Sequence, residues 1–136
     1  MVVMMILSKQ SKTRHLRKMI SRMTSLIDHQ LYCKVVFREP ESYFFPSEDY
    51  YSNDGDYGAI LVKTRRSNWD TILEMIPLIG EAHIHFMMLT EGIEEKERPP
   101  VLQYYEHWRK GIYWLKAQGF KIDEGACYKR MLQNLM

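Results

Sequence analysis

The spacing of apolar residues divides the first half of the chain into one helix and several strands. Between residues 11 and 29 apolar side chains recur every three or four positions, which is typical of an amphipathic helix: Leu16, Met19, Ile20, Met23, Leu26 and Ile27. Short apolar runs at 2–7, 31–37 and 57–64 predict strands. Residues 39–56 contain many of the Pro, Asn, Asp and Gly residues that favour turns, so they predict a long loop.

Two apolar runs follow. Residues 69–79, WDTILEMIPLI, fit a helix with Ser67 and Asn68 as caps, but their β-branched residues and Pro77 leave a strand ending before Pro77 as the alternative. Residues 82–89, AHIHFMML, predict a strand with the strongest pattern in the chain. The choice between helix and strand in the first run decides which of its side chains face those of the second.

Two helices are expected at the end of the chain. Proline in the first turn, at 98–100, opens the first of them, and Gly119 is the expected residue after its C-terminus. Its expected buried stripe is Val101, Tyr104, Tyr105, Trp108, Ile112 and Leu115. The last short helix buries Ala126, Tyr128, Met131, Leu132 and Leu135. The whole order predicts an α+β fold: a single domain, 1–136, with a ferredoxin-like antiparallel sheet, helices on one face and C-terminal helices.

Charge is segregated along the chain although the net charge is only +2. Residues 9–38 carry Asp28 as their one acid against many bases: Lys9, Lys12, Arg14, Arg17, Lys18, Arg22, Lys34 and Arg38. The next stretch, residues 39–57, carries six acids and no base. Such blocks suit a phosphate backbone or an acidic protein partner, and solvated faces of a stable fold are the alternative.

The cysteines and the N-terminus favour the cytoplasm. Cys33 and Cys127 lie far apart in the sequence and form no CxxC pair, so we expect free thiols in a reducing compartment. The apolar opening MVVMMIL is too short to span a bilayer, and its charges follow it, unlike those of a signal peptide. We therefore expect no membrane association.

The His-Ile-His sequence within 82–89 is the main candidate for chemistry. In a strand, His83 and His85 project from the same face, as two metal ligands must. If 70–76 is a strand paired with 82–89, Glu74 lies opposite His85 and supplies a third, carboxylate ligand for a divalent cation such as Mg²⁺ or Mn²⁺. Two partly buried core histidines are the alternative interpretation.

These residues resemble a known family. A glutamate followed after a turn by His-hydrophobic-His, in ILEMIPLIGEAHIHFMML, is similar to the central motif of HUH endonucleases, and YYEHWRKG (104–111) is similar to the stretch that follows it in some replication initiators. The resemblance implies a ferredoxin-like sheet, a bound Mg²⁺ or Mn²⁺ and a tyrosine that nicks and rejoins single-stranded DNA. Tyr128, beside Lys129 and Arg130, is the expected nucleophile, and Tyr113 is the reserve. The first strand differs from the Thr-rich first strand of many initiators.

Other side chains are candidates for nucleic-acid binding without chemistry. Arg14, Arg17 and Lys18 come from the basic helix. Arg109, Lys110 and Trp114 come from the aromatic and basic helix near the C-terminus, where stacking on single-stranded nucleic acid is expected.

Two other classes of protein compete with the endonuclease. The first is a non-enzymatic viral or mobile-element protein that binds and inhibits a host protein or nucleic-acid complex. The second is an acyltransferase similar to the GNAT family, on the basis of AHIHFMML, QGFKID and ACYKRML, although the Gly-rich pyrophosphate loop is replaced by the acidic GIEEKE.

Overall fold

The computed structural model of the chain describes residues 5–39, 49–54, 57–92 and 97–136. Its elements follow the order β1 (Ile6–Leu7), α1 (Thr13–Leu31), β2 (Cys33–Arg38), β3 (Tyr50–Asn53), β4 (Gly58–Lys63), α2 (Asn68–Glu91), α3 (Pro100–Ala117), β5 (Lys121–Ile122) and α4 (Glu124–Leu135). The α+β class is confirmed.

The described strands form two small sheets. In the larger one β4 is central: β2 pairs with it in parallel, and β3 pairs with it antiparallel. β1 and β5, from opposite ends of the chain, form a parallel pair. These mixed sheets differ from the predicted ferredoxin-like antiparallel sheet. β3 lies inside the stretch predicted to be a loop, so that prediction is wrong for Tyr50–Asn53, while 40–48 and 55–56 lie outside the described residues.

The predicted amphipathic helix is confirmed as α1. Its inner face is buried in the core: Leu16, Met19, Met23, Ile27 and Leu31. The C-cap residue after the helix is Tyr32, which takes a left-handed conformation with φ 48° and ψ 49° before β2 begins. The strands predicted at 31–37 and 57–64 are confirmed as β2 and β4, and β1 keeps only the last two residues of the strand predicted at 2–7 within the described part of the chain.

A single long helix, α2, replaces the two predicted elements at 69–79 and 82–89. Its N-cap is Ser67, whose Oγ accepts a hydrogen bond from the Asp70 backbone N–H, and it ends at Gly92, where φ is 66°. The helical alternative for 69–79 is therefore right, and the strand predicted for 82–89 is wrong. α2 packs against α1, β3 and β4 and also against α3. Its own apolar residues therefore lie all around the helix and show no one-sided helical period.

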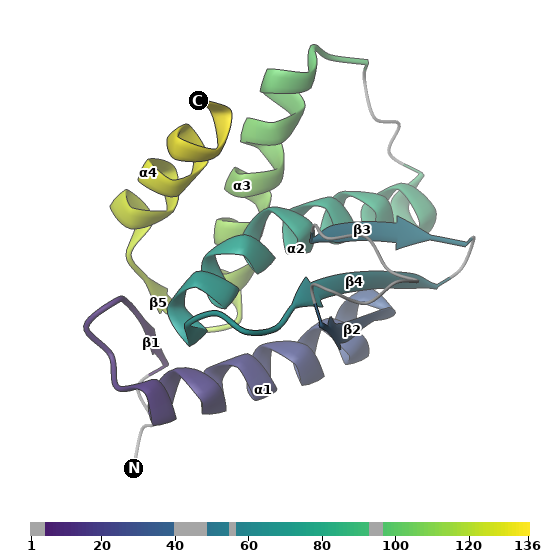
Figure 1. Cartoon of the computed structure of the whole chain (residues 1–136). Helices are drawn as coiled ribbons and strands as arrows, with labels where there is room; N and C mark the ends of the chain where they lie inside the picture. Colours follow the sequence, from purple (N-terminus) through teal and green to yellow (C-terminus); the bar gives the residue numbers. More distant parts are fainter. Residues whose placement is uncertain (1–4, 40–48, 55–56, 93–96) are drawn as a thin grey trace.

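Two glycines let α2 and α3 cross closely, above the layer formed by α1 (Figure 1). A Cβ added to Gly80 would lie 1.8 Å from the His107 carbonyl oxygen, and one added to Gly111 would lie 2.0 Å from the Ile76 carbonyl oxygen. No side chain larger than hydrogen fits at either position without separating the helices. Fully buried side chains of both helices, among them Ile76 and Trp108, pack around this crossing.

The C-terminal elements are confirmed in position but bury fewer residues than predicted. Gly119, with φ 96°, follows the end of α3 as expected. Val101 and Tyr105, predicted to be buried, are 58% and 40% exposed, because the first turns of α3 extend beyond α2 (Figure 1). Leu132 and Leu135 are also exposed, and α4 buries only Cys127 and Met131 fully.

Among the described helices, α2 alone has the length and apolar composition that a membrane span requires. A buried core helix of a soluble protein has the same composition, and much of α2 is buried inside this protein. The composition of α2 is therefore weak evidence for a membrane span.

Candidate functional site

The helical conformation of α2 separates the three predicted metal ligands. Residues two apart on an α-helix are rotated by about 200°, so His83 and His85 point to opposite sides. Glu74 shares the face of His85 but lies about 16 Å from it along the helix axis, since each residue adds about 1.5 Å. The same-face geometry predicted from a pair of strands is not formed, and the described residues contain no group of three side chains arranged to hold a metal ion.

His83 lies on the side of α2 that faces α3. Its Nδ1 atom is buried and has no hydrogen-bond partner among the described residues. Burial, followed by the nearby Lys110 charge, lowers the pKa of His83, so the imidazole is held in its neutral form. This environment corresponds to the core-histidine alternative.

His85 lies on the opposite side of α2, against the edge strand β3. Its Nδ1 is 2.9 Å from Asn53 Nδ2 and 3.2 Å from the Tyr51 hydroxyl, and Asn53 Nδ2 also donates to that hydroxyl at 3.1 Å. An amide N–H donates and does not accept, so Nδ1 of His85 is an acceptor and the ring proton resides on Nε2. This triad was not predicted, because Tyr51 and Asn53 lie in the stretch 39–56 that was predicted to be a loop.

Glu74 anchors α4 to α2. Its Oε1 accepts a hydrogen bond from Arg130 at 3.0 Å and one from Asn134 at 3.3 Å, and Arg130 also pairs with Asp70. The hydrogen bond from Ser67 and the Arg130 guanidinium hold the pKa of Asp70 below its usual value. Arg130, the neighbour of Tyr128 two positions along the chain, is therefore engaged by two carboxylates.

Tyr128, the expected nucleophile, is half-buried on α4. Its ring stacks on that of Tyr105, with centroids 6.1 Å apart and an interplanar angle of 27°. Burial raises the pKa of Tyr128, which disfavours the phenolate that would attack a phosphate. Lys129 beside it is exposed. The reserve residue, Tyr113, is 65% exposed on α3.

The residues predicted to bind nucleic acid lie on two separate surfaces. Arg14, Arg17 and Lys18 are exposed on α1, whereas Arg109 and Lys110 lie on α3, with α2 between the two helices (Figure 1). Trp114 was expected to stack on single-stranded nucleic acid, but its side chain is 4% exposed and belongs to the core. A stacking role for that ring is therefore excluded in this structure.

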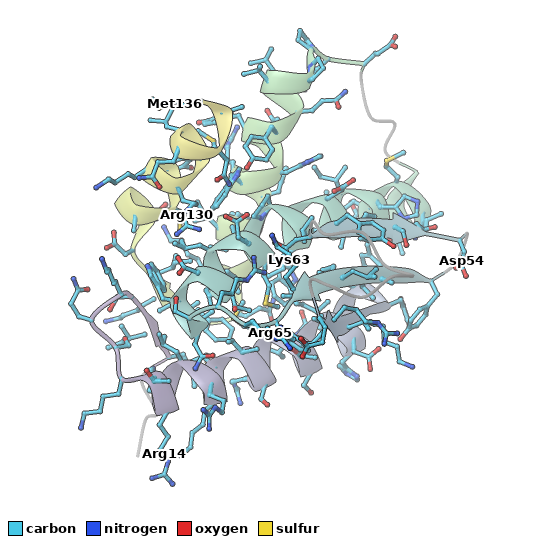
Figure 2. All side chains as sticks on the ribbon, in the orientation of Figure 1. Arg14, Asp54, Lys63, Arg65, Arg130 and Met136 are labelled. Carbon is cyan, nitrogen blue, oxygen red and sulfur yellow. The ribbon has the colours of Figure 1, made fainter. Side chains whose placement is uncertain are left out.

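A polar cleft of about 780 Å³ lies along α2, between the ends of β3 and β4 and the helices α3 and α4. Figure 2 labels Lys63 and Arg130, which line it from β4 and α4. Arg66 donates to both carboxylate oxygens of Asp49, at 2.8 and 2.6 Å. With this pair and the Arg130 pairs in place, most of the charge in the cleft is compensated within the protein.

Comparisons with known proteins identify no relative. No family model matches the chain, and neither a curated protein nor a solved structure matches it significantly. Function must therefore be inferred from the sequence and the geometry of the described residues.

Proposed function

We propose that the chain is a nucleic-acid-binding protein that contacts the phosphate backbone through the basic face of α1, defined as Arg14, Arg17, Lys18 and Arg22. All four side chains are exposed, and no described acid forms an ion pair with any of them. This unpaired cluster is the observation that carries the proposal. Figure 2 shows Arg14 pointing away from the body of the protein.

Helix geometry supports a shared binding surface. At 100° per residue, the four residues fall within about 140° of arc, opposite the buried stripe that contains Leu16 and Met23. From Arg14 to Arg22 the face extends about 12 Å along the axis, since each residue adds about 1.5 Å. Ser21 and Ser25 are exposed on the same side of α1 as the cations, and their hydroxyls are donors suited to phosphate oxygens.

The composition of this face favours nucleic acid over an acidic protein. Protein interfaces are built around buried apolar or aromatic anchors, and the basic face of α1 has none. Backbone binding to nucleic acid is mainly electrostatic and needs no such anchor. A membrane surface is disfavoured because the apolar side of α1 is already buried in the core and is not free to insert.

Strand nicking by Tyr128 with a bound Mg²⁺ or Mn²⁺ stays a prediction of the family resemblance. Our proposal does not depend on it, because the two histidines and Glu74 do not converge and the pKa of Tyr128 is raised. Incubation with labelled single-stranded DNA and Mn²⁺ tests it separately: a covalent adduct that survives denaturation and is lost in Tyr128→Phe would establish the nicking activity.

The salt dependence of binding tests the proposal. Fluorescence anisotropy with labelled single-stranded and duplex DNA of mixed sequence gives Kd at several salt concentrations. If four phosphates are neutralised, log K falls with log salt with a slope of about −3.6 for duplex and about −2.8 for single strands. A fourfold rise in salt then weakens binding about 150-fold or about 50-fold, respectively.

Paired variants locate the surface. Arg17→Gln with Lys18→Gln should reduce the magnitude of the duplex slope by about 1.8, because two phosphate contacts are lost. Arg109→Gln with Lys110→Gln on α3 removes the same charge from the other candidate surface and should leave the slope unchanged. The reverse result would place the interface on α3, and salt-independent binding to either DNA would contradict a phosphate contact.

A further inference from the structure

A small pocket lies beside the hydrogen-bonded triad of Tyr51, Asn53 and His85. Its volume is about 160 Å³, and apart from the triad and Thr90 its lining is apolar or aromatic: Leu31, Tyr32, Ala82, Phe86 and Leu89. The lining residues come from the end of α1, from β3 and from the C-terminal half of α2. Apart from His85, none of the described lining residues carries a formal charge at neutral pH.

The triad leaves one donor available to the pocket. His85 Nδ1 accepts hydrogen bonds, so Nε2 carries the ring proton. No described group accepts a hydrogen bond from Nε2, and this atom is not among the buried polar atoms without a partner. An accessible N–H of fixed orientation is the kind of polar group that orients a ligand in an otherwise apolar pocket.

Tyr32 lies at the pocket in an unfavourable backbone conformation. Its φ of 48° is in the left-handed region, where glycine is the usual residue after a helix and a bulky side chain is uncommon. The ring centroids of Tyr32 and Phe86 are 5.8 Å apart, although Tyr32 is 57% exposed. The strained tyrosine therefore contributes little to the core and places an aromatic ring beside the pocket.

We propose that this pocket binds a neutral, single-ring aromatic compound that carries a hydrogen-bond acceptor. Its volume is close to the roughly 150 Å³ of an engineered apolar cavity that holds benzene, so one ring fits. The acceptor receives the Nε2–H of His85, and the ring packs between Phe86 and Leu89. A charged carboxylate is disfavoured, because none of the described residues that line the pocket is a cation and the Glu81 charge acts on Tyr51. The site is independent of the nucleic-acid surface on α1.

Benzamide is the probe, with toluene and benzoate as matched compounds. Benzamide has the ring and a neutral carbonyl acceptor, toluene has the ring alone, and benzoate replaces the neutral acceptor by a charge. Titration followed by ¹H–¹⁵N NMR should shift the backbone amides of Asn53, His85 and Phe86 with benzamide in a saturable manner. Toluene should bind about tenfold more weakly, since it lacks one hydrogen bond, and benzoate more weakly than benzamide.

Variants at the two histidines provide the decisive comparison. His85→Phe keeps a ring and removes the donor, so benzamide affinity should fall about tenfold, to the level of toluene. His83→Phe, on the opposite side of α2, should leave benzamide affinity unchanged. Equal loss in both variants would show that the effect comes from the helix in general and would overturn the proposal.

Tyr32→Gly tests the pocket in a variant that is expected to stay folded, so a loss of binding cannot be attributed to misfolding. Glycine accepts the left-handed conformation, so this variant should be at least as stable as the parent protein, while its affinity for benzamide falls. If benzamide does not shift amides that line the pocket, or if Tyr32→Gly binds it with unchanged affinity, the assigned site is wrong.

Discussion

The close approach of α2 and α3 at two glycines gives the sharpest test of the fold. Gly80 on α2 and Gly111 on α3 each face a backbone carbonyl of the other helix, that of His107 and that of Ile76. A Cβ at Gly80 would lie 1.8 Å from the carbonyl oxygen, whereas real Cβ atoms stay beyond 3.0 Å. The obstacle is backbone, so no side-chain rotation relieves it. Gly80→Ala and Gly111→Ala must push the helices apart.

The magnitude follows from what surrounds the crossing. Relief of the Gly80 contact requires a separation of at least about 1.2 Å, which loosens a layer containing the fully buried Ile76 and Trp108. Overpacking of this kind costs about 1–3 kcal/mol and occasionally more, against at most about 1 kcal/mol gained from the higher helix propensity of alanine. Because the clash is with backbone, we expect a cost at the top of that range, about 3 kcal/mol, which leaves a net loss of about 2 kcal/mol and a Tm lower by roughly 7 °C.

Urea denaturation followed by circular dichroism measures this loss for each variant. Gly125→Ala in α4 is the matched control: its Cβ would meet nothing closer than 3.5 Å, so alanine should be neutral or stabilise by up to about 1 kcal/mol. The double variant should lose less than the sum of the single losses, since one separation relieves both contacts. Unchanged urea midpoints for Gly80→Ala and Gly111→Ala would refute the close crossing.

Two further predictions concern buried titratable groups. Burial and the Lys110 charge lower the pKa of His83, so the stability that depends on its neutral form is present above pH about 6.5, the unfolded value, and declines as the pH falls below that value. His83→Leu should therefore reduce the drop in urea midpoint between neutral and mildly acidic pH. An unchanged drop would show that another group causes the pH dependence. Burial raises the pKa of both Cys33 and Cys127 to about 12. A thiol reagent at pH 8 should therefore label neither cysteine in the native protein and both cysteines in urea. Rapid labelling of either cysteine in the native protein would contradict its burial.

The elements that could be predicted are those with one buried face. α1 has its apolar residues on one side, and β4 is a short run of β-branched and apolar residues, so a local pattern was sufficient for both. α2 is buried on two sides and therefore loses the one-sided period. Without that period, an apolar run such as AHIHFMML fits a buried helix as well as a strand, and only packing against α1 and α3 decides between them.

β3 was missed for a different reason. Tyr50–Asn53 lies among acidic and turn-forming residues, which together predicted a loop across the whole of 39–56. A narrower signal was available, since Asp54-Gly55 between Tyr51 and the apolar run from Gly58 is the dipeptide typical of a hairpin. The omission mattered, because β3 supplies two of the three polar groups in the triad.

The error in one secondary-structure element changed the chemistry assigned to two histidines. As a strand, 82–89 would place His83 and His85 in one site, and the sequence could not reveal that a helix divides them between two environments. His83 then enters the α2–α3 interface, where it is desolvated and lacks a partner for Nδ1. His85 instead meets Tyr51 and Asn53, more than 30 residues away, and this contact fixes its tautomer. Because such contacts depend on the fold, the spacing of two residues singled out both histidines as a pair, and only the structure separates their environments.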